Sequence, residues 1–235
     1  MIFRQLFEPH SSTYTYLIAC EATKKAILVD PVYPTWERDL NLIRELGLEL
    51  AYTVETHVHA DHITSALKLR QESGSRIAFP KESAAECPDL VVNHHQAFPF
   101  GDLALMPLYT PGHTDDHYAY LIADRVLTGD ALLIDGCGRT DFQNGDPADL
   151  YESLHNILLT LPDDTLVYPG HDYKGWTVST IGEEKRTNPR LEPPTKDAFI
   201  ELMDNLDLPD PKMMDVAVPA NRACGMPDEA AGGAA

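Results

Sequence analysis

The stretch Thr56-His57-Val58-His59-Ala60-Asp61-His62 places three imidazoles and one carboxylate side by side. Neutral imidazole and ionised carboxylate are the ligands that zinc and iron(II) prefer in proteins. A segment that only filled a core would carry apolar residues at these positions. The stretch therefore predicts a metal site, which the rest of the chain must support.

The surrounding pattern places this stretch in a loop between a strand and a helix. Residues 48–55 predict the strand, and residues 61–73 carry a helical period that ends at Gly74. Further strands are predicted over 14–20, 25–30, 76–79, 103–109, 118–123, 125–127 and 165–168, and further helices over 35–46, 147–161 and 196–206. Loops at strand ends are where α/β proteins place ligand-binding side chains, because the strands form a rigid scaffold.

Three later loops repeat the arrangement of a metal-type side chain directly after a predicted strand. His113, Asp130 and His171 each follow a glycine, which lets the backbone turn sharply and present the side chain. Because these three residues occur in the same chain as the stretch 56–62, we do not expect them to be isolated surface residues. The remaining histidines lack such a context and are expected to be surface or core residues: His10, His94, His95, His117 and His155.

The ordered set H-x-H-x-D-H, single His, Asp and final His resembles the metallo-β-lactamase superfamily over residues 14–172. This resemblance implies an α/β fold of the metallo-β-lactamase-like four-layer αβ/βα sandwich type. We expect one such domain over residues 1–226 and a disordered tail over 227–235. In that superfamily, His57, His59 and His113 would face one metal position, and Asp61, His62 and His171 a second. Asp130 would be shared.

Two chemistries are compatible with these residues. The full set could hold two zinc or iron ions that generate a hydroxide nucleophile, as in a glyoxalase II-like hydrolase of glutathione thioesters. The subset His57, His113 and Asp130 could instead form a facial triad that leaves open positions on one iron(II). The spacing is compatible with both.

The segment Gly136-Cys137-Gly138-Arg139-Thr140-Asp141-Phe142-Gln143 favours the second alternative. It resembles the signature of the persulfide dioxygenases, whereas glyoxalase II enzymes share only its Cys-Gly-Arg part. The resemblance implies one Fe(II) per chain, held by His57, His113 and Asp130. It also implies oxidation of glutathione persulfide by O2 and water to sulfite and glutathione. Only residues 172–235 follow His171, which is short for the extra helical domain of glyoxalase II enzymes.

The other candidate residues then need separate roles. We expect His59, Asp61, His62, His171 and Asp172 to support the ligands through hydrogen bonds, or in the alternative to bind a second metal. Glutathione carries two carboxylates, so a cation is needed in the substrate site; the candidates for substrate binding are Arg139, Tyr173 and Lys174. We expect Cys137 to be a structural thiol. A lactonase-like hydrolase and a non-enzymatic metal-binding module are the remaining alternatives.

Charge and composition limit the partners and the compartment. The balance of 18 basic against 37 acidic residues gives a net charge of −19, which argues against binding to nucleic acid or to anionic membranes. The four cysteines show no paired spacing, so we expect no disulfide scaffold and a reducing compartment. The N-terminal residues lack a signal-peptide pattern, so we expect a cytoplasmic protein. The resemblance also implies a homodimer.

Overall fold

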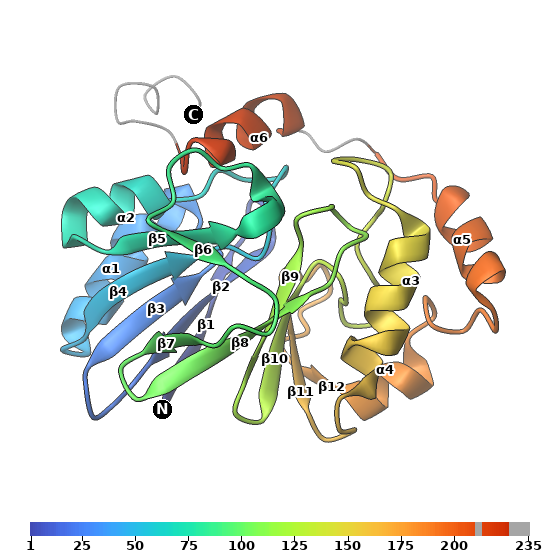
Figure 1. The fold of residues 1–235 in the computed structure, drawn as a ribbon, viewed down its shortest axis with the longest axis horizontal. Coiled ribbons are helices and arrows are strands. Elements are labelled where there is room, and N and C mark those ends of the chain that lie inside the picture. Colours follow the sequence, from blue (N-terminus) through green and yellow to red (C-terminus); the bar gives the residue numbers. More distant parts are fainter. Residues whose placement is uncertain (210–212, 226–235) are drawn as a thin grey trace. The chain divides into compact units, whose positions relative to one another are not determined.

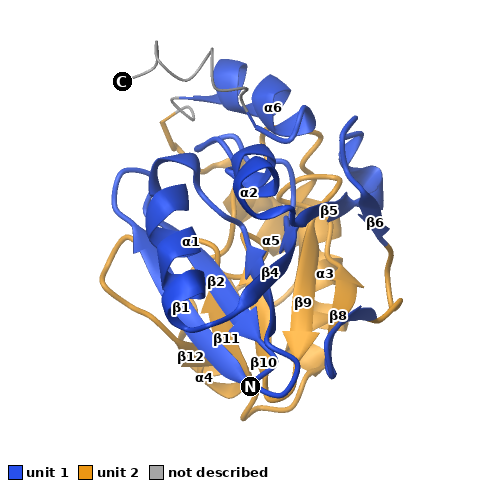
Figure 2. Cartoon of the chain, turned by 90° about the vertical axis from the view of Figure 1, so that its left-hand side faces the viewer, with its two compact units in different colours: residues 1–92, 98–104, 211–235 blue, residues 93–97, 105–210 orange. Residues whose placement is uncertain are grey.

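The computed structural model describes residues 1–209 and 213–225. The chain forms two compact units, which Figure 2 distinguishes by colour. Unit 1 comprises residues 1–92, 98–104 and 211–235, and unit 2 comprises residues 93–97 and 105–210. The single domain over 1–226 stays a prediction, and the predicted tail over 227–235 lies outside the described residues.

Unit 1 is built on a six-stranded sheet in the simple order β1-β2-β3-β4-β5-β6 (Figure 1). The strands are β1 (Ile2–Glu8), β2 (Thr13–Ala19), β3 (Lys25–Val29), β4 (Glu49–Val54), β5 (Arg76–Pro80) and β6 (Leu90–Val92). The pairs β1–β2 and β2–β3 are antiparallel, and the pairs from β3 to β6 are parallel. The carboxyl ends of β3 and β4 therefore lie at one edge, where the histidine stretch begins.

The helices of unit 1 are α1 (Trp36–Glu45), α2 (Ala66–Ser73) and α6 (Met214–Arg222), with short 3-10 turns at Tyr33–Thr35 and Lys81–Ser83. Leu40 and Ile43 lie one helical turn apart on α1 and pack against Leu17 and Leu28 of the sheet. This apolar contact fixes α1 on the sheet. The strands then carry the loop at their carboxyl ends as a rigid frame.

The second sheet has the order β12-β11-β10-β9-β8-β7. Its strands are β7 (Phe98–Phe100), β8 (Leu103–Tyr109), β9 (Tyr118–Ile122), β10 (Arg125–Gly129), β11 (Leu166–Pro169) and β12 (Ser179–Thr180). Residues 98–104, which include β7 and the start of β8, are part of unit 1. The helices of unit 2 are α3 (Pro147–Asn156), α4 (Ile181–Thr187) and α5 (Lys196–Asp204), with a 3-10 turn at Leu158–Thr160. Leu150, Leu154 and Phe199 pack against the sheet residues Val126 and Val167.

The predicted helix over 61–73 begins only at Ala66. The backbone before it is bonded elsewhere: Ser65 N–H donates to Pro31 O (2.8 Å), and Ile63 O accepts from Tyr33 N–H (2.8 Å). Groups committed to these distant partners cannot close helical turns. The predicted helix over 147–161 likewise ends at Asn156 and continues as a 3-10 turn.

The cysteine spacing predicts no disulfide scaffold, yet Cys87 and Cys224 form one disulfide. The two residues are 137 positions apart, so sequence spacing gave no sign of the pair. Cys20 and Cys137 are free thiols. The cysteines of this chain therefore give no support for a reducing compartment.

Candidate metal centre

Residues 55–65, here called the histidine loop, connect β4 to α2 in unit 1. The side chains of His57, His59 and His62 are all buried, with exposed fractions of 1%, 2% and 3%. Ring centroids lie 4.1 Å apart for His57 and His59, and 4.3 Å apart for His59 and His62. The three imidazole rings therefore lie together within this unit.

A hydrogen-bond chain fixes the tautomer of His57. The Thr56 hydroxyl donates its single proton to Asp30 Oδ2 (2.9 Å), and Asp30 Oδ1 accepts from Thr56 N–H (2.7 Å). The same hydroxyl lies 2.9 Å from His57 Nδ1, so it accepts a hydrogen bond from that nitrogen. His57 therefore carries its proton on Nδ1 and presents a lone pair on Nε2, as a metal ligand must.

His59 is engaged by two buried carboxylates. Its Nε2 lies 3.2 Å from Asp30 Oδ1 and 3.4 Å from Glu55 Oε2. Burial alone would lower the pKa of His59, but the charges and hydrogen bonds of Asp30 and Glu55 outweigh it and raise the pKa well above its usual value. Burial also raises the pKa of Glu55, although the bond to His59 opposes this. The His59 side chain is therefore held in place by these two buried carboxylates.

Asp61 and His62 form a second pair on the same loop. His62 Nδ1 lies 2.9 Å from Asp61 Oδ2, and Thr13 Oγ1 donates to the same carboxylate oxygen at 3.3 Å. His62 Nε2 is buried without a hydrogen-bond partner among the described residues. His59, Asp61 and His62 each offer a ligand atom within 4.8 Å of the others. An orphaned buried nitrogen is costly, so this group fits a bound water or cation.

In unit 2, His113, Asp130 and His171 come together from three strand-end loops. The His113 Nδ1–H donates to Arg139 O (2.7 Å), which leaves the Nε2 lone pair facing Asp130 Oδ2 at 3.5 Å. His171 Nδ1 lies 2.7 Å from the other carboxylate oxygen, Asp130 Oδ1. His171 therefore orients Asp130, and one imidazole nitrogen and one carboxylate oxygen are presented together.

His117 is a buried support that the sequence prediction missed. Asp130 N–H donates to His117 Nε2 (3.0 Å), so His117 is protonated on Nδ1, which lies 2.8 Å from Thr110 Oγ1. The side chain is fully buried. Because His117 does not follow a predicted strand, the sequence pattern places it among the surface or core residues and gives it no role at the site. Its role is to hold the backbone from which the Asp130 carboxylate projects.

Two glycines allow the close approach of these loops. Gly112 has φ +133°, and a Cβ there would lie 2.2 Å from Leu150 N at the start of α3. At Gly138, a Cβ would meet Asp130 O at 2.2 Å and His113 Nδ1 at 2.8 Å. The segment that carries Arg139 can therefore cross His113 and Asp130 only without a side chain at position 138.

The predicted substrate-binding residues differ in how much they are already bonded. The Arg139 guanidinium binds both oxygens of Asp141 at 2.7 Å and donates to Pro209 O at 2.6 Å. Tyr173 is 73% exposed. Asp172 accepts hydrogen bonds from Lys174 N–H (3.1 Å) and Gly175 N–H (2.6 Å). Asp172 thus shapes the loop that displays Tyr173 and Lys174.

Cys137 lies in the same segment and behaves as a structural thiol. Its sulfur is 3.7 Å from Met203 Sδ, and burial raises the pKa of the thiol to about 12. A thiol with this pKa stays protonated at neutral pH, so it is a poor nucleophile. This agrees with the role predicted for it.

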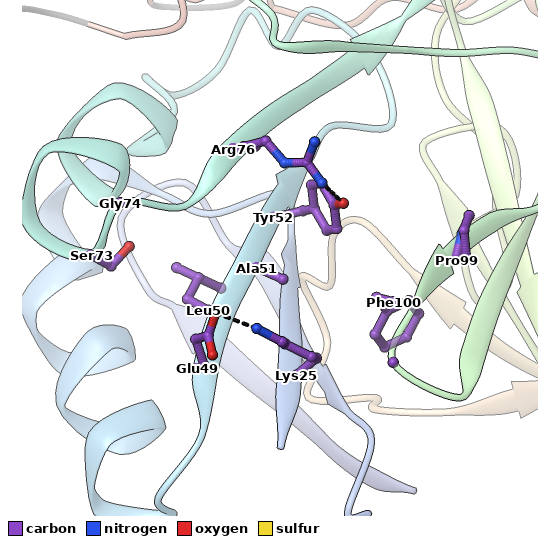
Figure 3. A pocket seen from close by; sticks show the side chains of 11 residues that line it. Lys25, Glu49, Leu50, Ala51, Tyr52, Ser73, Gly74, Arg76, Pro99 and Phe100 are labelled. Carbon is purple, nitrogen blue, oxygen red and sulfur yellow. Dashed lines mark hydrogen bonds and ion pairs between the residues drawn. The ribbon is translucent and has the colours of Figure 1, made fainter. Parts of the chain in front are cut away.

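A separate cavity of about 360 Å³ lies in unit 1 at the amino ends of β3, β4 and β5 (Figure 3). Its charged groups have partners within the lining: Lys25 binds the Glu49 carboxylate, and Arg76 donates to the Tyr52 hydroxyl. Histidine is absent from its lining, and the strands run from this end towards the histidine loop. We therefore assign the metal chemistry to the opposite end of this sheet.

The candidate residues that follow predicted strands are recognisable in the sequence, whereas most of the residues that bond to them are not. Asp30 and Glu55 end the predicted strands 25–30 and 48–55, so the rule that found Asp130 could have identified them. Asn221 on α6, which bonds to the histidine loop from a distant part of the chain, had no local signal. The sequence therefore predicted the presented side chains better than their supports.

Comparison with known proteins agrees with this assembly of loops. The model of the metallo-beta-lactamase superfamily matches residues 9–171. The chain is 48% identical over 229 residues to the mouse protein named "Persulfide dioxygenase ETHE1, mitochondrial", with 96% of this chain and 89% of that protein covered. The human protein of the same name is 47% identical over the same length and coverage.

A solved structure gives the same result for the fold. The crystal structure of ETHE1 from Myxococcus xanthus is 55% identical and superposes with a TM-score of 0.94, covering 96% of this chain and all of the other. The predicted α/β fold of the metallo-β-lactamase type is thereby confirmed. A fold of this type implies a bound metal, and the ligand tautomers described above fit one. The chain belongs to the metallo-β-lactamase superfamily and, within it, to the persulfide dioxygenase family.

Proposed function

We propose that this protein is an iron(II)-dependent persulfide dioxygenase. It oxidises glutathione persulfide with O2 and water to sulfite and glutathione. The observation that carries this proposal is the similarity to relatives named persulfide dioxygenase over 96% of the chain. The segment from Gly136 to Gln143 lies within residues 9–171, which the superfamily model matches.

We propose His57, His113 and Asp130 as the ligands of one iron per chain. Each histidine carries its proton on Nδ1 and presents Nε2, and Asp130 presents Oδ2 because His171 occupies Oδ1. Two imidazoles and one carboxylate suit iron(II) and leave open positions for substrate and O2. When bound, the iron would supply a place where the persulfide sulfur and O2 meet in a defined orientation.

In this proposal, the other polar residues position the ligands. His59 is committed to Asp30 and Glu55, and His171 orients Asp130. We propose that His62 and Asp61 hold water or substrate through His62 Nε2, which has no hydrogen-bond partner among the described residues. The same atom is the observation that favours the second candidate, a glyoxalase II-like hydrolase with a second metal at Asp61, His62 and His171.

For the substrate, we propose Tyr173 and Lys174 as contacts of the glutathione moiety. Tyr173 is exposed, and the Asp172 carboxylate fixes the backbone at Lys174. Arg139 would grip a glutathione carboxylate in exchange for part of its ion pair with Asp141. Arg139 would keep a carboxylate partner throughout, because a glutathione carboxylate replaces part of the contact with the Asp141 carboxylate.

Oxygen consumption is the test of this function. Protein loaded anaerobically with Fe(II) is mixed with glutathione persulfide in an oxygen electrode, and sulfite is measured in the same sample. We expect one O2 consumed per sulfite formed. Hydrolysis of a glutathione thioester without O2 uptake on the persulfide would instead support the hydrolase.

Compartment and assembly remain parts of the same proposal. No helix in residues 1–209 and 213–225 has the length and apolar character needed to cross a bilayer. The curated relatives from mouse and human are named mitochondrial. We propose a cytoplasmic homodimer for this chain, which fractionation and light scattering would test.

A further inference from the structure

Asn221 of α6 binds the histidine loop from a distant part of the chain. Its Nδ2 donates to His59 O and His62 O, both at 2.8 Å, and its Oδ1 accepts from Thr64 N–H at 2.8 Å. The side chain is 1% exposed. Every one of its bonds goes to the backbone of residues 59–64, so Asn221 shapes the loop without touching an imidazole through these bonds.

These bonds explain why the loop keeps a non-helical shape. Buried carbonyl groups without partners would each cost about 1–3 kcal/mol. Within the loop, the His59 and His62 carbonyls receive the two N–H groups of one amide and are thereby held at a fixed spacing. The directions of the His59 and His62 side chains follow from that backbone.

A second set of contacts fastens the segment that carries Asn221. Leu67 N–H donates to Cys224 O (2.9 Å), and Glu86 N–H donates to Arg222 O (2.9 Å). The disulfide joins Cys224 to Cys87, with 6.0 Å between the Cα atoms. Cys224 also belongs to an apolar cluster with Val58, the residue between His57 and His59. The Cys224 end of the disulfide therefore packs in the same apolar cluster as a residue of the histidine loop, and α6 lies next to α2 (Figure 2).

We propose that residues 213–225 form a clamp on the histidine loop, in which Asn221 is the positioning residue and the Cys87–Cys224 disulfide is a thiol-exchange site that releases it. The reductant is a low-molecular-weight thiol. Glutathione is such a thiol and would be the product of the proposed function, on which this part of the inference rests.

The exchange has a defined direction. Cys224 is completely buried and Cys87 is partly exposed, so the incoming thiolate attacks Cys87 Sγ. The S–S bond breaks, a mixed disulfide forms at Cys87, and the Cys224 sulfur leaves as a thiolate that takes up a proton. A second thiolate then attacks the sulfur of the bound small thiol, releases Cys87 as a thiolate and forms the disulfide of the two small thiols. Two electrons pass from two thiols to the protein disulfide.

Metal affinity tests the positioning role independently of catalysis. Fe(II) binding is titrated anaerobically against a competing chelator for Asn221→Ala and Asn221→Asp, and melting of the metal-free proteins is followed in parallel. Asn221→Asp keeps the acceptor for Thr64 but loses both donors. Asn221 acts on the proposed ligand His57 indirectly: it holds the backbone at His59, whose side chain shares Asp30 with the Thr56 hydroxyl that binds His57. We therefore expect about 10-fold weaker Fe(II) binding for both variants, the lower end of the range for residues that orient metal ligands. Asn205→Ala, an exposed asparagine at the end of α5, should bind Fe(II) as wild type does.

Wild-type Fe(II) affinity in a folded Asn221→Asp protein would overturn the positioning role. If the Asn221 variants do not fold, Cys87→Ser provides the second test, because it opens the clamp and keeps Asn221. We expect Cys87→Ser to bind Fe(II) about 10-fold more weakly, within the range for ligand-orienting residues.

The proposed thiol exchange at the disulfide is tested with the wild-type protein. Anaerobic glutathione should raise the thiols titrated in denaturant from two to four per chain, since Cys20 and Cys137 are already free. The reduced protein should then match Cys87→Ser in Fe(II) affinity, and glutathione should leave Cys87→Ser unchanged. Four thiols before reduction, or unaltered affinity after it, would overturn the exchange site. Failure of persulfide oxidation alone would leave these results in place and count only against the proposed function.

Discussion

At the scale of single residues, His117 is the clearest case of a side chain that acts through another. It is fully buried, and its Nε2 accepts the backbone N–H of Asp130. Removing an orienting partner of a metal ligand usually lowers metal affinity by about 10–100-fold. We therefore expect His117→Ala to bind Fe(II) more weakly by this factor. Equilibrium dialysis of the folded variant against Fe(II) measures the change.

His117→Gln is the matched rescue, because the Gln carbonyl oxygen can occupy the place of Nε2 and accept the same N–H. It should recover most of the affinity. His155→Gln is the control, since His155 stacks on Tyr151 in α3. Equal affinity of His117→Ala and wild type would show that the Asp130 backbone needs no such support.

The candidate metal ligands could be predicted from the sequence at this scale, whereas the residues that hold them by hydrogen bonds could not. His57, His113 and Asp130 each follow a strand that hydrophobic periodicity predicts. The hydrogen bonds of Thr56, His117 and Asn221 depend on which backbone atoms the fold brings near them. Single-sequence patterns carry no information on such distant pairs.

At the scale of elements, the buried carboxylate of Glu184 joins α4 to the loop that precedes Cys137. Glu184 Oε2 accepts from Asp135 N–H (3.0 Å) and from Asn188 Nδ2 (2.8 Å). Burial raises the pKa of Glu184 above its usual value, although both hydrogen bonds oppose the shift. The folded state therefore holds the proton more tightly than the unfolded chain.

This shift predicts a pH dependence of stability. A raised carboxyl pKa contributes stability below the unfolded value of about 4.5, and the contribution is lost as the pH rises through the folded pKa. Glu184→Gln removes this titration and keeps an oxygen acceptor. We expect its melting temperature to rise relative to wild type as the pH goes from ~4 to ~7. Thermal melts across that range measure the difference.

Glu183→Gln is the control for this prediction, because Glu183 is exposed on the same helix. A constant difference between Glu184→Gln and wild type at all pH values would contradict the burial argument. The helix itself was not predicted from the sequence. Its seven residues, Ile181–Thr187, are too short for periodicity to be distinguished from a polar loop.

Elements also show where local pattern misleads. Residues 61–73 carry a helical period, but only the part from Ala66 onward forms a helix. The backbone groups of residues 63–65 are instead bonded to Pro31, Tyr33 and Asn221. Helix α6 contains Pro219, which lowers the helical tendency of its sequence. Tertiary bonds override local preference at both places, and both places belong to the histidine loop and its clamp.

At the scale of the whole molecule, the strand-end loops explain why the fold class could be predicted. Their order along the chain is a superfamily pattern, and the superfamily model matches residues 9–171. The disulfide could not be predicted, because Cys87 and Cys224 meet only in the folded chain. The spacing of the ligands did not decide the number of metals either, since the same side chains serve as ligands for a second ion or as supports for the first.

The number of metals is therefore the measurement that tests the central claim most directly. Iron and zinc are counted per chain by elemental analysis in the wild type and in Asp130→Ala, Asp61→Ala and His171→Ala. We predict one iron per wild-type chain, loss of that iron in Asp130→Ala, and retention in Asp61→Ala. His171→Ala should retain iron with lowered affinity, because Asp130 loses its orienting partner. Two metals per wild-type chain, falling to one in Asp61→Ala, would contradict the account and establish a dinuclear centre.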